Sequence, residues 1–246
     1  MASPNESKSK AGNVGTARNG HRFAAAGATA LAALFACAFA GNALAQSAGS
    51  ITLRAGATQI APDVTSGDLT APSFPGTKAD VKSDTQPTAG ITWMLSDQVA
   101  IDLPLAAGFK HDIVGAGAIA GVGKIGEVRA LPVTLLAQYR FLGAGSSLRP
   151  YVGIGPTYAK FYKARSTAAL TALTGGSPAN PTTLSLESKW GVTAQVGLAA
   201  SLSGNWGLDA SVAKTALKTR ATLSTGQTLD TKLDPWSYSL GVSYRF

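Results

Sequence analysis

One histidine follows residue 45, and it is the first place to look for chemistry. His111 stands between Lys110 and Asp112. A hydrolase would need a serine or another nucleophile beside this histidine, together with an acid. No nucleophile motif surrounds His111, and a single histidine supplies no cluster of metal ligands. We therefore predict that the protein is not an enzyme and that it holds no metal and no cofactor.

Five charged residues of both signs are the stronger candidates for a functional group. They alternate with bulky apolar residues, as the inward face of a strand alternates with its outward face. They are Arg54, Asp102, Arg140, Asp209 and Arg245. Whether they meet depends on the elements that carry them.

The last eleven residues give the clearest of these elements. Residues 236–246 place Trp, Tyr, Leu, Val, Tyr and Phe on one face and small or polar residues on the other. Such a strand is typical of an outer-membrane β-barrel, in which bulky groups face lipid and small or polar groups face the lumen. Phe246 is then the residue at which the barrel-assembly machinery would recognise the last strand.

Seven further segments alternate in the same way, which predicts an all-β fold, an eight-stranded antiparallel transmembrane β-barrel. The predicted strands are 50–60, 86–96, 98–109, 127–142, 149–163, 188–202, 205–219 and 236–246. Long loops alternate with short turns, and such barrels keep the short turns in the periplasm. We expect both termini to be periplasmic and the long loops to be extracellular. Loop 110–126 is apolar enough to fold over the barrel mouth or to lie near the lipid, and a flexible glycine-rich loop is the equal alternative.

Residues 1–45 are expected to be a signal peptide, which leaves 46–246 as the barrel. Four basic residues precede an apolar stretch, and Ala43-Leu44-Ala45 follows it, so cleavage is expected after Ala45. Its removal takes away four of the 21 basic residues, one of the 13 acidic residues and the only cysteine, which leaves a charge of +5. Disulfides are thereby excluded. A mild positive charge on an exported barrel favours anionic lipid over nucleic acid as a partner.

The five charged residues all lie near the periplasmic ends of their predicted strands. Charges inside a narrow barrel must be paired or hydrated. We expect Asp102 to pair with Arg140 and Asp209 to pair with Arg245, with Arg54 across the closing seam. The hypothesis is a salt-bridged plug of the periplasmic half of the lumen. The alternative is that the charges solvate an open lumen and stabilise its wall.

Two prolines suggest a way out of a plugged barrel. Pro104 and Pro132 fall inside neighbouring predicted strands, where each removes a donor from the hydrogen-bond ladder. Unpaired backbone there would loosen the wall and permit a sideways opening. Prolines at ordinary bulges are the alternative.

Four segments resemble the OmpW family, namely 98–111, 131–141, 149–158 and 233–246, and Arg54 to Gly56 fit the same pattern. The resemblance covers nearly all of residues 50–246. It implies a Gram-negative outer-membrane barrel with a narrow, partly hydrophobic lumen. Members are thought to help small hydrophobic molecules across the outer membrane and to release them sideways through the wall. The first, third and fourth loops depart most from the family's pattern.

The predicted function is a porin-like outer-membrane channel or carrier that passively admits small hydrophobic molecules, with lateral exit. The alternative is a structural or interaction barrel that binds lipopolysaccharide, a host surface, phage or bacteriocin without transport. Basic residues near the outer rim fit lipopolysaccharide head groups and are compatible with both functions: Lys163, Arg165, Lys189, Lys218, Arg220 and Lys232. The expected partners are lipopolysaccharide and outer-membrane lipid, small hydrophobic ligands and the barrel-assembly machinery, and no nucleic acid.

Overall fold

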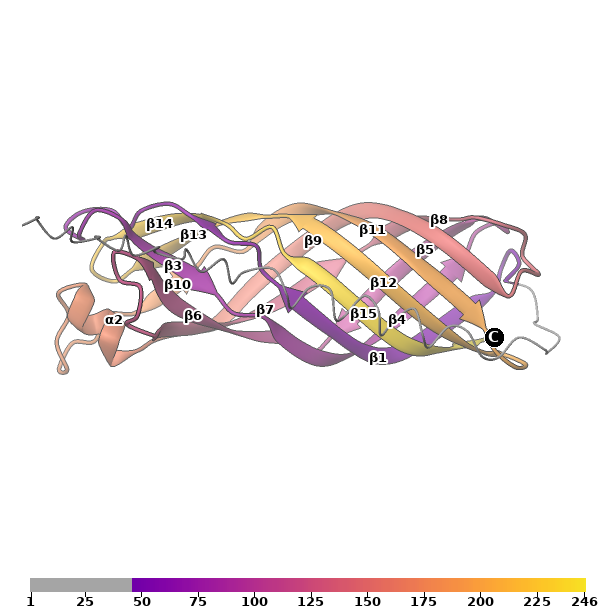
Figure 1. The fold of residues 1–246 in the computed structure, drawn as a ribbon, viewed down its shortest axis with the longest axis horizontal. Coiled ribbons are helices and arrows are strands. Elements are labelled where there is room, and N and C mark those ends of the chain that lie inside the picture. The colour runs from indigo at the N-terminus through magenta and orange to yellow at the C-terminus, as the bar shows by residue number, and fades with distance from the viewer. Residues whose placement is uncertain (1–45) are drawn as a thin grey trace, which may run out of the picture. The chain divides into compact units, whose positions relative to one another are not determined.

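A computed structural model describes residues 46–246, so the predicted signal peptide and its cleavage after Ala45 lie outside the described residues. The described chain forms a closed antiparallel barrel (Figure 1). Its wall strands are β1 (Ile51–Ala61), β4 (Asp84–Met94), β5 (Val99–Ala106), β7 (Lys124–Thr134) continued by β8 (Leu136–Arg140), β9 (Leu148–Ser166), β11 (Lys189–Ser201), β12 (Trp206–Ala216) and β15 (Trp236–Arg245). β1 pairs with β15 and β9 pairs with β11, which closes the ring. The predicted eight-stranded barrel is confirmed.

The alternation of side chains along the strands sorts them between the two faces of the wall. On β15, Tyr238 and Leu240 are each 46% exposed on the outer face, whereas Arg245 is 6% exposed and points inward. An outer face covered with exposed apolar side chains suits lipid, and an inner face of small and polar side chains suits a narrow lumen.

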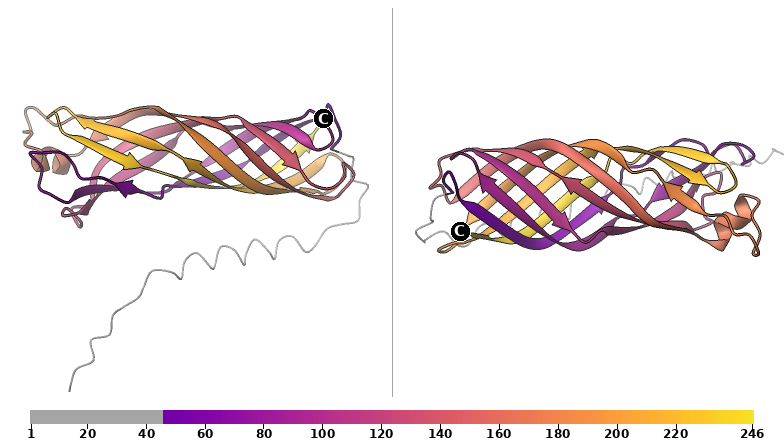
Figure 2. Two further views of the ribbon diagram at one scale, coloured as in Figure 1. Left: turned by 90° about the horizontal axis from the view of Figure 1, so that it is seen from above. Right: turned by 180° about the vertical axis from the view of Figure 1, so that it is seen from behind.

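The two ends of the barrel differ in how the strands are joined (Figure 2). At one end, here called the short-turn end, brief turns join β4 to β5, β8 to β9 and β11 to β12. Both ends of the described chain lie there: Phe246 N–H donates to Ile51, and Gln46 N–H donates to Ala144 in the β8–β9 turn. The other end, called the long-loop end, carries the long connections.

The long connections are themselves structured. They contain β2 (Thr65–Ser66), β3 (Thr77–Val81), β6 (Phe109–Gly117), α2 (Ala168–Leu173), β10 (Leu184–Leu186), β13 (Lys218–Leu223) and β14 (Thr228–Lys232). Strands β10, β13, β14 and β2 form a second, four-stranded sheet. Segment 110–126 contributes Ile113, Ile119 and Ile125 to a buried apolar cluster together with Val128 and Leu170. The apolar loop therefore packs against the other long connections and forms part of a core at this end.

Two neighbouring wall strands are irregular. The third wall strand bends at Gly108, whose φ of +101° is a conformation that favours glycine, and continues as β6. The fourth is interrupted at Leu135, between β7 and β8. Among the described residues, no helix is both long and apolar enough to cross a membrane.

Candidate functional site: a lumen closed at one end

Arg54 is the centre of a charged network that crosses the lumen near the short-turn end. Its Nη2 lies 2.9 Å from each carboxylate oxygen of Asp102, and its Nη1 lies 3.7 Å from Oδ1 of Asp209. Thr92 donates to Asp102 at 2.6 Å, and Tyr151 donates to Asp209 at 3.0 Å. Asp102 is fully buried. One arginine thus neutralises two carboxylates that are almost completely buried.

The partners differ from those that the strand order predicted. No ion pair within residues 46–246 joins Asp102 to Arg140 or Asp209 to Arg245. Arg54 takes both carboxylates because its side chain is long enough to pass over β4 and reach β5. Arg140 instead donates to the side-chain oxygens of Gln46 and Gln138, at 2.9 Å and 3.1 Å. The predicted pairings were wrong, although all five residues point into the same end of the lumen.

Three further residues complete this network, and the sequence reasoning missed them. Arg149 donates to the main-chain oxygen of Gln46 at 2.9 Å and also to the carbonyl of Asp97. Tyr151 lies under the Arg140 guanidinium, which is 4.9 Å from the ring centroid. Arg149 and Tyr151 share the inward parity of β9, and this parity could have identified them. Gln46 precedes the first strand and had no such signal.

Glycines on the facing strands make room for these large side chains. Gly90 stands opposite Arg54 in the β1–β4 register, and a Cβ there would lie 2.7 Å from Arg54 Nη2. Gly197 stands opposite Tyr151 in the β9–β11 register, and a Cβ there would overlap the Tyr151 ring. These two glycines therefore allow Arg54 and Tyr151 to fill the short-turn half of the lumen.

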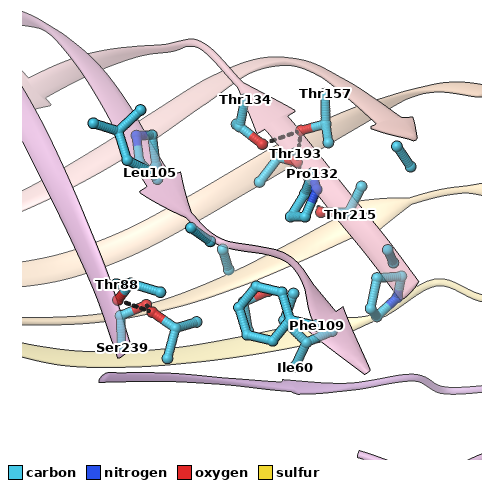
Figure 3. A pocket seen from close by; sticks show the side chains of 18 of the residues that line it. Ile60, Thr88, Leu105, Phe109, Pro132, Thr134, Thr157, Thr193, Thr215 and Ser239 are labelled. Carbon is cyan, nitrogen blue, oxygen red and sulfur yellow. Dashed lines mark hydrogen bonds between the residues drawn. The ribbon is translucent and has the colours of Figure 1, made fainter. Parts of the chain in front are cut away.

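The lumen above the network is hollow. A cavity of about 170 Å³ begins at Arg54 and Asp209 and extends toward the long-loop end. Its middle carries a chain of hydroxyl hydrogen bonds across four strands, Thr134–Thr157–Thr193–Thr215, at 2.8, 2.5 and 2.7 Å (Figure 3). Thr58 bonds Thr88 and Ser239 on the opposite wall. Because the hydroxyls bond one another, they present mainly methyl groups to the cavity.

The part of the cavity nearest the long-loop end lies beyond the aromatic pair of Tyr158 and Trp190. It is lined by apolar side chains and one histidine. The lining there includes Phe109, Val128, Phe161, Leu217 and Leu233. His111 is 4% exposed, stacks on Phe109 and bonds the carbonyl oxygen of Lys82 through Nδ1 at 2.8 Å. Burial lowers the pKa of His111, so the ring is neutral at neutral pH. The histidine is part of an apolar wall.

The wall lacks backbone pairing beside this cavity. β5 pairs with β8 only from Val99 to Asp102, and pairing between β6 and β7 begins at Phe109. Within the described residues, no ladder joins 103–108 to 131–135. We call this interruption the wall gap. Pro104 and Pro132 lie on its two borders and line the cavity, as do Leu105 and Leu136. Figure 3 shows Leu105 and Pro132 at the cavity.

Comparison with known proteins places this architecture in a family. The chain matches the OmpW family over residues 47–246. It belongs to the OmpW family. Outer membrane protein W of Escherichia coli K12 is 34% identical over 209 residues, which are 84% of this chain and 92% of that protein. Outer membrane protein W of Vibrio cholerae is 30% identical over 202 residues, which are 80% of this chain and 89% of that protein.

A solved structure of the same kind is also similar. The crystal structure of outer membrane protein OprG from Pseudomonas aeruginosa matches with a TM-score of 0.73 and 28% identity, over 82% of this chain and 98% of that chain. This OmpW-family chain is therefore an outer-membrane barrel protein. Within residues 46–246, no group of three or more histidine, cysteine or acidic side chains is placed to hold a metal ion.

Proposed function

We propose that this OmpW-family barrel passively admits small hydrophobic molecules and releases them sideways through the wall gap. The short-turn end, which carries Gln46 and Phe246, faces the periplasm, and the long loops face outward. The observation that carries the proposal is the course of the cavity, which ends on the Arg54 network and borders the wall gap. Its volume of about 170 Å³ resembles that of an engineered apolar cavity of roughly 150 Å³ that binds benzene.

The chemistry of the lining supports an apolar cargo. An apolar molecule gains from leaving water for a cavity of methyl and aromatic groups. It gains nothing from the region around Arg54, where both carboxylates are bound by Arg54 and by a hydroxyl group, and where entering would break charge-assisted hydrogen bonds. The path of least free energy therefore turns sideways at the height of Pro104 and Pro132, where neither residue has an N–H to close the wall.

The outer surface at the wall gap is compatible with release into lipid. Leu105, Val133 and Leu135 are 42%, 51% and 49% exposed there. An apolar molecule that leaves between these side chains passes from one apolar environment to another. Phe246, which is 68% exposed at the short-turn end, is available to the barrel-assembly machinery as the last residue of the closing strand. No step of this proposal is catalytic.

The test is uptake of a hydrophobic tracer by liposomes that contain the protein. A short bis-maleimide would bridge Leu105→Cys and Val133→Cys, which face each other if the β5–β8 register is continued across the wall gap. The control bridges Ala57→Cys and Leu240→Cys, which are register partners at the fully paired β1–β15 seam. The only natural cysteine, Cys37, lies in the predicted signal peptide.

We expect the bridge at the wall gap to reduce uptake to the level of empty liposomes and the seam bridge to leave uptake unchanged. Equal uptake by both bridged proteins would exclude lateral exit. A wild-type protein that is no faster than empty liposomes would exclude transport and favour the interaction barrel.

A further inference from the structure

Two groups of exposed cations lie at the long-loop end, on different strands. The first, here called the basic pocket, is a hollow of about 250 Å³ lined by Lys110, Glu127, Val128, Arg129, Lys163 and Arg165. The second, here called the paired patch, contains Lys189, Lys218, Arg220 and Lys232 beside Glu187 and Asp230. The two groups are similar in sequence composition, but they differ in how their charges are used.

The paired patch is largely neutralised by its own carboxylates. Lys189 Nζ lies 2.7 Å from Glu187, and Arg220 binds Asp230 through Nε at 2.6 Å and Nη2 at 2.9 Å. The hydrogen bonds from Arg220 lower the pKa of Asp230, so this carboxylate stays ionised. Lys232 Nζ lies 4.0 Å from Asp234, so three of the four cations of this patch have a carboxylate partner.

The basic pocket retains unneutralised charge. Lys124 and Lys110 bind Glu127 at 2.8 Å and 3.0 Å, and these contacts hold the pKa of Glu127 at about 2. They use the pocket's only carboxylate. Across residues 46–246, no carboxylate forms an ion pair with Arg129, Lys163 or Arg165. Three cations thus line the hollow without an ion-pair partner, because its one carboxylate is bound by lysines, and their combined positive potential favours an anion there.

The backbone is bent to bring these cations together. The register between β7 and β9 shifts between Glu127 and Arg129, which marks a bulge. Within the bulge, Lys163 has a φ of +51°, a left-handed conformation that a lysine rarely adopts. Bulges re-aim side chains and are enriched near functional sites, and strained residues persist where the surrounding structure holds them.

The position of the pocket indicates what the anion belongs to. Arg129 lies four residues along β7 from the exposed Val133, about 13 Å at roughly 3.3 Å per residue along a tilted strand. Tyr158 and Trp190, whose rings lie 5.0 Å apart, mark the aromatic belt on the neighbouring strands. The pocket therefore begins where lipid head groups meet the barrel, directly above the wall gap.

We propose that the basic pocket binds the phosphorylated sugar head group of an outer-leaflet lipid of the lipid A class. Arg129 and Arg165 supply planar guanidinium groups, which match phosphate oxygens two at a time. Val133 and Leu135 below the pocket contact the acyl chains of the same molecule. A soluble phosphate compound would use the cations but would leave this apolar surface uncovered. The lipid covers the wall gap from outside, and its binding does not depend on transport.

The test measures binding of fluorescent lipid A to the full barrel in detergent micelles. One variant carries Arg129→Gln, Lys163→Gln and Arg165→Gln, and the matched control carries Lys189→Gln, Lys218→Gln and Lys232→Gln in the paired patch. Both lose three positive charges from exposed positions, so their net charges are equal. The resistance of each barrel to unfolding by heat in detergent verifies that both are folded. The additional probes are lipid A without its phosphates and inorganic phosphate.

We expect the pocket variant to bind lipid A roughly 100-fold more weakly, at about fivefold for each of the three cations. The control variant should bind lipid A nearly as tightly as the wild type does. The wild type should bind lipid A without phosphates as weakly as the pocket variant binds intact lipid A. Equal weakening in both variants would overturn the proposal in favour of general surface charge. Equal affinity for inorganic phosphate and lipid A would exclude the lipid as the occupant. Tracer uptake is a separate measurement, so failure here leaves the proposed transport intact.

Discussion

The two halves of the lumen are built on the same eight strands, yet one is filled and the other is hollow. In the short-turn half, Arg54 and Tyr151 each face a glycine, so each long side chain passes over the neighbouring strand and bonds a carboxylate two strands away. In the other half, the inward residues are threonines, alanines, prolines and larger apolar side chains such as Phe109 and Phe161, and together they leave a cavity of about 170 Å³. The size of the inward residues decides whether an eight-stranded barrel is a plug or a pocket.

The two halves also differ in what holds the wall together. At the short-turn end the ladder is continuous and is reinforced by side chains that bridge several strands. Beside the cavity the ladder between residues 103–108 and 131–135 is missing. Among residues 46–246, only the Tyr162 hydroxyl bonds across this gap, donating to the Ala107 carbonyl at 3.3 Å. The filled half gives rigidity, and the hollow half has the weak wall that a sideways route requires.

Removal of Arg54 should have the largest effect, because it would abolish the distinction between the halves. Arg54→Ala leaves Asp102 and Asp209 buried without their cation, and breaking such a pair costs about 3–5 kcal/mol. We expect the free energy of unfolding in urea to fall by this amount. Single-channel recordings should show increased conductance, because water can then hydrate the carboxylates from the cavity. Asp102→Ala and Arg140→Ala should also change conductance.

The matched control for this change is Lys214→Ala. Lys214 forms an ion pair with Asp63 at 2.9 Å, but that carboxylate is 69% exposed. Exposed pairs contribute about 0–1 kcal/mol, so this variant should unfold almost as the wild type does. If Arg54→Ala were equally harmless and conductance stayed constant, the charges would merely solvate the lumen, and the plug would be disproved.

Adding atoms to each half tests packing independently of charge. Gly197→Ala places a methyl group against the buried Tyr151 ring, and such overpacking costs about 1–3 kcal/mol. Ala213→Phe adds far more volume, but it extends into the cavity. We expect Ala213→Phe to unfold at nearly the wild-type urea concentration and to slow tracer uptake strongly. Ala194→Phe, on the exposed outer face of β11, should change neither the urea concentration of unfolding nor the rate of tracer uptake. Equal destabilisation by the first two variants would contradict a hollow upper half.

The strands were predictable because lipid on one side and a narrow lumen on the other impose strict alternation. The predicted segment 50–60 is β1 at Ile51–Ala61, and 236–246 is β15 at Trp236–Arg245. The inward parity of the charged residues was predictable for the same reason. The ion pairs could not be predicted, because the distance that a side chain reaches across a curved wall depends on the residues of the strand between. Gly90 on β4 leaves room for Arg54 to pass over that strand.

Other parts of the site depend on contacts between segments far apart in the chain. Arg140 and Arg149, roughly a hundred residues away, both donate hydrogen bonds to Gln46. The sequence around Gln46 contains no pattern that predicts these contacts. The small sheet of β10, β13, β14 and β2 joins three long connections, each of which reads as a loop by itself. The threonine chain could have been found, since Thr157, Thr193 and Thr215 all have inward parity.

The smallest expected effect is a pH dependence confined to the hollow half. Burial lowers the pKa of His111 below its usual 6.5, whereas Asp84 and Asp112 nearby act in the opposite direction with less effect. A depressed pKa means that the unfolded chain binds the proton first. The stabilisation is therefore complete above about pH 6.5 and is lost as the pH falls through the folded-state pKa. The loss is at most about 1.4 kcal/mol for each unit of pKa shift.

The same proton would place a charge in the apolar wall of the cavity, so uptake of a hydrophobic tracer should decrease over the same pH range. Arg54 cannot lose its proton in this range, so the filled half should not respond. His111→Gln keeps a polar side chain of similar size and removes the titration. We expect the unfolding free energy and the tracer uptake of this variant to depend less on pH than those of the wild type between about pH 5 and 7.

Identical pH profiles for the two proteins would show that protonation of His111 affects neither the stability nor the uptake. Any acid sensitivity would then have to come from groups other than His111, and the expected contrast between the titratable wall of the cavity and the permanently charged Arg54 would disappear.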